Sequence, residues 1–261
     1  MHPKMSEETL TFWDHLEVLR HSLLKILAAS VVMGILAFCM KEPLFDVVLA
    51  PSRSSFVTYS LLGAEPFAIN LINTGLTEQF MIHMKVALLA GLIIASPYVI
   101  YVLFCFISPA LYDNERRISI RLGASAYAMF IIGALVNYFL IFPLTVRFLG
   151  TYSVSDDISN MLTLSSYVDT LLMMTLVFGI VFEIPVICWL LACAGMLRSE
   201  WMSRYRRHAI VVIMIISAII TPTADMFTLV MVSLPIWLLY EISIRIVMIT
   251  EKEKYKTNRQ T

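Results

Sequence analysis

One apolar run, residues 171–197, limits the folds open to this chain more than any other segment. It reads LLMMTLVFGIVFEIPVICWLLACAGML, and its only acidic residue is Glu183, two positions before Pro185. About 20 helical residues cross the hydrocarbon core of a bilayer, so the run predicts a transmembrane helix with a kink at Pro185. A carboxyl group at mid-membrane costs about 3 kcal/mol, so we expect Glu183 to face other helices or a water-filled cavity. The alternative is a structural role, in which a protonated Glu183 hydrogen-bonds to a neighbouring helix.

The composition extends this prediction to the whole chain of 261 residues, of which 59% are apolar and 15% are charged. Soluble domains are about 45–50% apolar, so we predict an all-α polytopic membrane protein with six transmembrane helices in a single domain. The last two helices are predicted to be short, because the run 208–220 forms only about 20 Å of helix and the next run ends near Tyr240. The predicted spans are residues 22–40, 80–106, 122–144, 171–197, 208–220 and 226–248.

Three further segments are predicted from their polarity. Residues 1–21 are polar and amphipathic, with Phe12, Leu16 and Leu19 at helical spacing, which predicts an interfacial helix leading into the first span. Residues 41–78 alternate short apolar pieces with turn residues and predict a structured cap with short helices. Residues 251–261 are charged and predict a mobile tail, and no cleavable signal peptide is evident in the sequence.

The basic residues predict the orientation of these spans. Of the 19 Lys and Arg residues, Lys41, Arg53 and Arg147 fall on one side of the membrane and Lys85 lies near that side. The other 15 fall on the opposite side, which the positive-inside rule assigns to the cytoplasm. We therefore expect both termini in the cytoplasm and the loops at 41–78, 148–167 and 221–225 outside.

The sequence carries no pattern typical of an enzyme or a metal protein. It has no Gly-rich phosphate loop, no HExxH and no GxSxG, and its five His and four Cys residues are scattered without metal-ligand spacing. The net charge is zero, so no bulk field suggests a nucleic acid as partner. We expect no catalysis, no cofactor, no bound metal and no nucleic-acid partner.

A loop acid among arginines is the clearest candidate for binding. Glu115 lies in the segment YDNERR, on the predicted cytoplasmic side. A surface ion pair with Arg116 or Arg121 would contribute at most about 1 kcal/mol. In the alternative, Glu115 receives a cationic ligand, and a guanidinium group would suit it because it pairs bidentately with carboxylates.

Several segments together resemble the TatC family, the multispanning subunit of the twin-arginine protein translocase. The resemblance lies in FWDHLEVLR at 12–20, PALYDNERR at 109–117, FEIP at 182–185, YRR at 205–207, TPTAD at 221–225 and LPIWLLYE at 234–241. It implies a receptor in the cytoplasmic (inner) membrane that binds twin-arginine signal peptides of folded cargo. It also implies export driven by the proton-motive force, single-span TatA/TatB-type partner subunits and a homo-oligomeric complex.

The resemblance also implies roles for particular residues. Glu115, Phe106, Arg116, Glu17, Leu19 and Arg20 would bind the signal peptide. Asp225, Pro222, Met231 and Ile213 would contact a partner subunit, Glu183 is the intramembrane polar site, and Pro51 shapes the external loop.

Two positions depart from the family pattern. Val18 stands where the family has Glu, and Glu17 precedes it by one residue, or about 100° around a helix. Leu229 stands where many relatives have Gln, so a polar contact to the partner is either missing or supplied by Thr228.

Two other functions are compatible with the sequence. The first is a proton- or ion-coupled transporter of small molecules with Glu183 as the coupling site, for which broken helices at Pro97 and Pro185 would be suitable. A transporter of this kind usually shows internal repeats, and we find no convincing repeat here. The second is a structural subunit of a larger complex.

Overall fold

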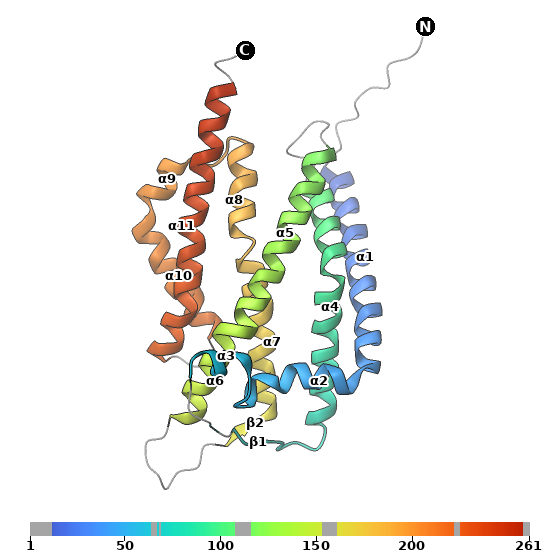
Figure 1. The fold of residues 1–261 in the computed structure, drawn as a ribbon. Coiled ribbons are helices and arrows are strands. Elements are labelled where there is room, and N and C mark those ends of the chain that lie inside the picture. The colour runs from blue at the N-terminus through green and yellow to red at the C-terminus, as the bar shows by residue number, and fades with distance from the viewer. Residues whose placement is uncertain are drawn as a thin grey trace.

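The computed structural model describes residues 12–63, 67, 69–107, 116–152, 161–221 and 225–257. Side chains are described for these residues except 12–15, 104–107, 116–121 and 253–257. The described part is a bundle of long helices with a layer of short elements across one end (Figure 1).

The long bundle is formed by α1 (Phe12–Cys39), α4 (Glu78–Ile107), α5 (Arg116–Val136), the π-helical turn η3 (Asn137–Ile141), α6 (Phe142–Thr151), α7 (Leu164–Val181), α8 (Ile184–Cys193), α9 (Ser199–Arg204), α10 (Arg206–Ile220) and α11 (Met226–Thr257). The start of α1, the end of α4, the start of α5 and the end of α11 lie at the same end of the bundle (Figure 1). We call it the terminal end, and we call the opposite end, where the short elements lie, the cap end.

Within the described residues, five helical segments are long and apolar enough to cross a membrane. They are Leu16–Cys39, Glu78–Leu103, Leu122–Thr151, Leu164–Cys193 and Met226–Lys252. The short helix α10 has 15 residues, or about 22 Å of helix against a core of about 30 Å. Of the six predicted spans, only the one that corresponds to α10 is too short to be among these five segments.

Two predictions about the ends of the chain are corrected. The interfacial helix predicted within residues 1–21 does not form a separate element from Phe12 on, because no Gly or Pro interrupts the chain between Phe12 and the first span, and α1 is continuous. The last helix is not short, since α11 has 32 residues and continues to Thr257, into the segment predicted to be a tail. Beyond Tyr240, α11 buries Ile244 and Val247 against Ala192 and Met202 of the neighbouring segments, which explains why it continues.

The two middle spans are interrupted. The third predicted span ends at 144, but the helical chain continues through η3 and α6 to Thr151, with Pro143 near the start of α6. Proline is tolerated there because the first turn of a helix has no partner for its backbone N–H group. The fourth span breaks at Phe182–Glu183, as the Pro185 kink predicted, and α8 ends before Gly195, whose φ of 78° reverses the chain.

The cap end has the short helices predicted for residues 41–78. It consists of α2 (Lys41–Leu49), the 3-10 turn η1 (Ala50–Ser52), α3 (Val57–Leu61) and the two-residue strands β1 (Leu71–Ile72) and β2 (Leu162–Thr163). The strands pair in parallel, with Leu71 opposite Leu162 and Ile72 opposite Thr163. This pair joins the segments that precede α4 and α7.

Small residues allow the long helices to approach closely. A Cβ atom placed on Gly91 of α4 would lie 2.3 Å from the backbone N of Gly34 and 2.7 Å from the carbonyl O of Ser30, both on α1. A Cβ atom on Gly133 of α5 would lie 2.5 Å from the carbonyl O of Phe178 on α7. Such contacts are typical of helices that pack within a membrane, where close van der Waals contact replaces the hydrophobic effect.

Candidate functional site

The terminal end collects the predicted signal-peptide residues that the structure describes. Glu17 and Arg20 are exposed on α1, and Leu19 is half-buried there. Phe106 lies in the last turn of α4 and Arg116 begins α5, although their side chains are outside the described set. The ends of these three helices lie at the same end of the bundle (Figure 1). Glu115 lies outside the described residues.

Glu183 lies at the break between α7 and α8, as the residue that precedes the first turn of α8. Its two carboxylate oxygens are both buried, and neither has a hydrogen-bond partner among the described residues. The backbone carbonyl of Glu183 accepts a hydrogen bond from the N–H of Ile187 at 2.9 Å, which starts α8. An ionised carboxylate without partners is strongly disfavoured in a buried site, so this arrangement favours the neutral acid.

A buried hydrogen bond between side chains links the third and fourth spans. The side-chain amide of Asn137 donates to the hydroxyl of Thr175 at 2.9 Å, and Asn137 is fully buried in the π-helical turn η3. Its carbonyl oxygen Oδ1 has no partner among the described residues. The signal for this site in the sequence was the single Asn in an apolar span, but its partner is 38 residues away.

The helix α9 is held against α11 at the terminal end. Glu251 of α11 accepts hydrogen bonds from the backbone N of Ser199 at 3.2 Å and from its hydroxyl at 2.5 Å. The Tyr240 hydroxyl donates to the carbonyl of Met202 at 2.8 Å, and Arg206 pairs with Glu241 at 3.1 Å. These contacts fix both sides of the junction between α9 and α10, and the sequence patterns did not predict them.

Asp225 caps the last helix. Its carboxylate accepts hydrogen bonds from the backbone N and the hydroxyl of Thr228, at 2.7 and 2.8 Å from Oδ1. Thr228 is fully buried, so its side chain offers no surface to a partner, which favours the alternative that the polar contact is missing at Leu229. Its hydroxyl turns inward to the capping carboxylate because an N-cap acid requires donors in the first turn.

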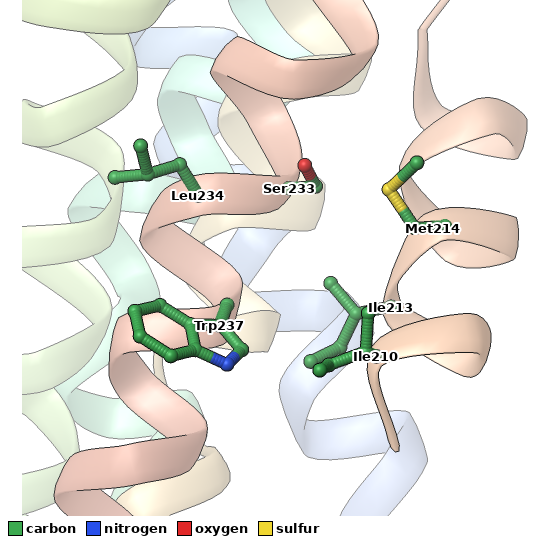
Figure 2. Close-up of a pocket in the computed structure, with 6 residues that line it drawn as sticks. All are labelled: Ile210, Ile213, Met214, Ser233, Leu234 and Trp237. Atoms are coloured by element: carbon green, nitrogen blue, oxygen red, sulfur yellow. The ribbon is translucent and has the colours of Figure 1, made fainter. Parts of the chain in front are cut away.

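A groove lies between α10 and α11. It has a volume of about 300 Å³ and is lined by Ile210, Ile213, Met214, Ser233, Leu234 and Trp237. Figure 2 shows Trp237 of α11 and Ile210 and Ile213 of α10 on either side of the space. Of the four residues predicted to contact a partner, Ile213 lines this groove, Met231 is half-buried outside its lining, and Pro222 lies outside the described residues.

Pro51 is buried in the cap. The Tyr59 hydroxyl lies 2.8 Å from the carbonyl of Pro51 and 2.9 Å from the carbonyl of Pro143, and it donates to them. Burial raises the pKa of the Tyr59 phenol far above its ordinary value, so the hydroxyl keeps its proton. Tyr59 thus connects η1 to the start of α6.

An ion pair joins the cap-end halves of α4 and α7. The Lys85 ammonium lies 2.7 and 3.0 Å from the two carboxylate oxygens of Asp169, and both side chains are about half exposed. Lys85 was expected near one membrane interface, and its partner Asp169 could not be identified from the sequence because the two residues are 84 positions apart. Among the described residues, no group of three His, Cys, Asp or Glu side chains is placed to hold a metal ion.

Comparison with known proteins decides the family. A family model for the Sec-independent protein translocase protein (TatC) matches residues 14–235. The chain belongs to the TatC family. It is similar to the Sec-independent protein translocase protein TatC of Desulforapulum autotrophicum, with 35% identity over 91% of this chain and 84% of that protein. The TatC protein of Koribacter versatilis is 32% identical over 98% of this chain and 93% of its own length.

A solved structure agrees with this family. The crystal structure of the twin-arginine translocase receptor TatC has a TM-score of 0.76 and 33% identity, and the match covers 90% of this chain and 99% of that one. The chain is therefore a TatC-family subunit of a Sec-independent protein translocase, a transport protein of the membrane. The terminal end, Glu183 and the groove between α10 and α11 are the candidate sites on this TatC fold.

Proposed function

We propose that this TatC-family chain is the signal-peptide receptor and core subunit of a twin-arginine translocase, which exports folded proteins using the proton-motive force. The observation that carries the proposal is the likeness, over nearly the whole chain, to a solved structure that is itself called a twin-arginine translocase receptor. The placement of α1, α4 and α5 supports it, since their ends meet at the terminal end, where the predicted peptide-binding residues are found.

In this proposal the terminal end lies on the cytoplasmic side of the inner membrane. The excess of basic residues in its loops supports the orientation. Single cysteines at Asn114, Arg204 and Asn258 should react only from the cytoplasmic side, and one at Asp157 only from outside. Labelling of position 114 from outside would reverse the orientation and remove the peptide site from the compartment where cargo folds.

Glu115 is proposed as the acid that receives the arginine pair of the signal peptide, with Phe106, Arg116, Leu19 and Arg20 around it. Glu115→Ala should weaken photocrosslinking of a twin-arginine signal peptide to the membrane-inserted protein. Glu115→Arg should weaken it further, because like charges repel the ligand. Glu17 is one residue from the family position, so Glu17→Ala should have a smaller effect.

A matched control for Glu115 is Glu200, an exposed acid in the other arginine-rich connection at the same end. Glu200→Ala removes one acidic charge from that end without touching the proposed peptide site. Equal crosslinking in Glu115→Ala, Glu115→Arg and Glu200→Ala would mean that Glu115 does not bind the peptide and forms only a surface ion pair.

The groove between α10 and α11 is proposed to receive a single-span partner subunit. Its lining is apolar except for Ser233, whose hydroxyl donates to the carbonyl of Val230 at 3.1 Å. A short α10 leaves a mismatch with the bilayer that a partner helix would relieve. Crosslinkers at Ile213 and Met231 should therefore reach the partner. Crosslinks found only from α1 and α5 would contradict this placement.

Glu183 is proposed to act after recognition, in assembly or passage of cargo. Because its carboxyl oxygens lack partners, a neutral amide replaces the neutral acid at modest cost, whereas Ala removes the polar group at the helix break. Glu183→Gln should keep membrane insertion and partial transport, and Glu183→Ala should reduce transport more than abundance. If Gln abolishes transport while peptide binding and assembly stay normal, the ion-coupled mechanism is favoured instead.

A further inference from the structure

A second, larger groove runs between α1, α4 and α7, away from the groove described above. Its volume is about 690 Å³, and its walls include Leu27 and Val31 of α1, Leu88 and Leu92 of α4, and Met173 and Leu176 of α7. Apart from Ser30 and Lys85, all the side chains that line it are apolar. It can therefore hold a hydrocarbon chain.

The length of this groove follows from the helices that form it. Near its middle, Gly91 of α4 packs against Ser30 and Gly34 of α1. The groove reaches Leu23, seven residues from Ser30, on one side and Lys85, six residues from Gly91, on the other. Because α1 and α4 run in opposite directions (Figure 1), these distances add to about 20 Å at 1.5 Å per residue. One leaflet of the hydrocarbon core is about 15 Å thick, so the groove is as long as an acyl chain in one leaflet.

One end of the groove carries two opposite charges. Lys85 lines it, and the carboxylate of Asp169 lies 2.7 Å from its ammonium group. The 30 residues of α4 measure about 45 Å, so a centred core of about 30 Å begins about five residues after Glu78. Lys85 therefore lies within about one turn of that boundary, where lipid headgroups are in reach.

The Lys85–Asp169 pair is open to such a headgroup. The exposed fractions of the two side chains are 51% and 46%, so the pair is accessible from outside the protein. The hydroxyl of Ser165 donates to Asp169 at 3.3 Å and holds the carboxylate on α7. A cation and an anion side by side match a headgroup that carries both a phosphate and an ammonium, whereas the carboxylate repels a headgroup that carries only negative charge.

We propose that the groove between α1, α4 and α7 is a binding site for one aminophospholipid such as phosphatidylethanolamine. Its acyl chain lies along Leu88, Leu92 and Met173, its phosphate accepts from the Lys85 ammonium, and its own ammonium donates to Asp169. A quaternary ammonium has no N–H to donate, so phosphatidylcholine binds less well. The lipid belongs to the leaflet at the cap end.

The test is native mass spectrometry of the whole protein, purified and supplied with equal amounts of three lipids that share the same chains. Phosphatidylethanolamine should be retained most, phosphatidylcholine less and phosphatidylglycerol least. The double variant Lys85→Met, Asp169→Asn removes both charges without leaving one unpaired, and it should lower phosphatidylethanolamine retention about tenfold, which corresponds to about 1.4 kcal/mol.

The cap offers a matched control. Arg53 and Asp46 form an exposed ion pair at 3.0 Å away from the groove. The double variant Arg53→Gln, Asp46→Asn removes the same number of charges and should retain lipid as the unaltered protein does. Equal retention of all three lipids, or equal loss in both double variants, would overturn the proposal.

A photoreactive residue at Leu88 separates lipid from protein as the occupant, since this exposed side chain lines the groove. In native membranes it should label phospholipid. Labelling of a partner helix in place of lipid would assign the groove to a protein and would also overturn the proposal.

Discussion

Replacing Gly91 by Ala should separate α1 from α4. The added Cβ would lie 2.3 Å from the backbone N of Gly34 and 2.5 Å from its Cα. Ordinary contacts between such atoms are about 3.5 Å, so α1 must move by about 1.2 Å. Both clashing atoms belong to the backbone, and no side-chain rotation relieves them. Overpacking of this kind lowers the free energy of unfolding by about 1–3 kcal/mol, and the better helix propensity of Ala offsets up to about 1 kcal/mol of that loss.

Two other glycines supply controls for Gly91→Ala, one in the same interface and one outside it. A Cβ on Gly34 would meet the carbonyl O of Ala87 at 3.5 Å, an ordinary contact, and a Cβ on Gly123 of α5 would meet nothing within 4 Å. We expect Gly34→Ala and Gly123→Ala to be neutral or stabilising by up to about 1 kcal/mol.

Thermal unfolding in detergent measures the difference among the three variants. A net loss of about 1–2 kcal/mol lowers the Tm of a protein of this size by about 2–8 °C. Spin labels on the exposed faces of α1 and α4 should report a longer separation in Gly91→Ala alone. If Gly91→Ala is as stable as Gly34→Ala and shows the same separation, the close contact between these helices does not exist.

Three further substitutions test single contacts, two by thermal unfolding and one by hydrogen exchange. Asp225→Ala removes the cap of α11 and the partner of the buried Thr228 hydroxyl, and should lower the free energy of unfolding by about 1–2 kcal/mol. Asp225→Asn keeps a capping side chain and should retain most of that stability. Glu251→Ala should release the start of α9 at Ser199 and speed hydrogen exchange of α9 amides, with Glu251→Gln intermediate. Tyr59→Phe removes the donor to the carbonyls of Pro51 and Pro143 and should cost about 1–3 kcal/mol; an unchanged Tm would mean that water replaces the hydroxyl.

The long apolar spans and the short helices of the cap followed directly from the sequence, because hydropathy and Pro positions act locally. The extent of α11 did not, since the apolar run ends near Tyr240, just before the charged residue Glu241. Glu241 instead pairs with Arg206 across the terminal end. Whether a charged residue ends a span depends on its partner, and that partner is distant in sequence.

The polar contacts of the sites were hidden from the sequence for the same reason. Lys85 and Asp169 are separated by 84 residues, and no periodicity connects them. Thr228 was one of two alternatives for a polar contact to a partner, but its hydroxyl donates to the capping carboxylate of Asp225. Helical spacing predicts which residues share a face, whereas the direction of that face is set by tertiary packing.

The pairing of β1 with β2 has a consequence for the order of folding. Leu71 and Leu162 come together only after the chain between them, which contains α4, α5 and α6, has been threaded through the bilayer. A contact of such long sequence separation carries a large loop-closure cost and forms late. The β1–β2 pair therefore closes only after α6 is in place, and until then two strand edges stay open at the membrane surface, where a protease or a quality-control factor can distinguish a half-inserted chain from a finished one.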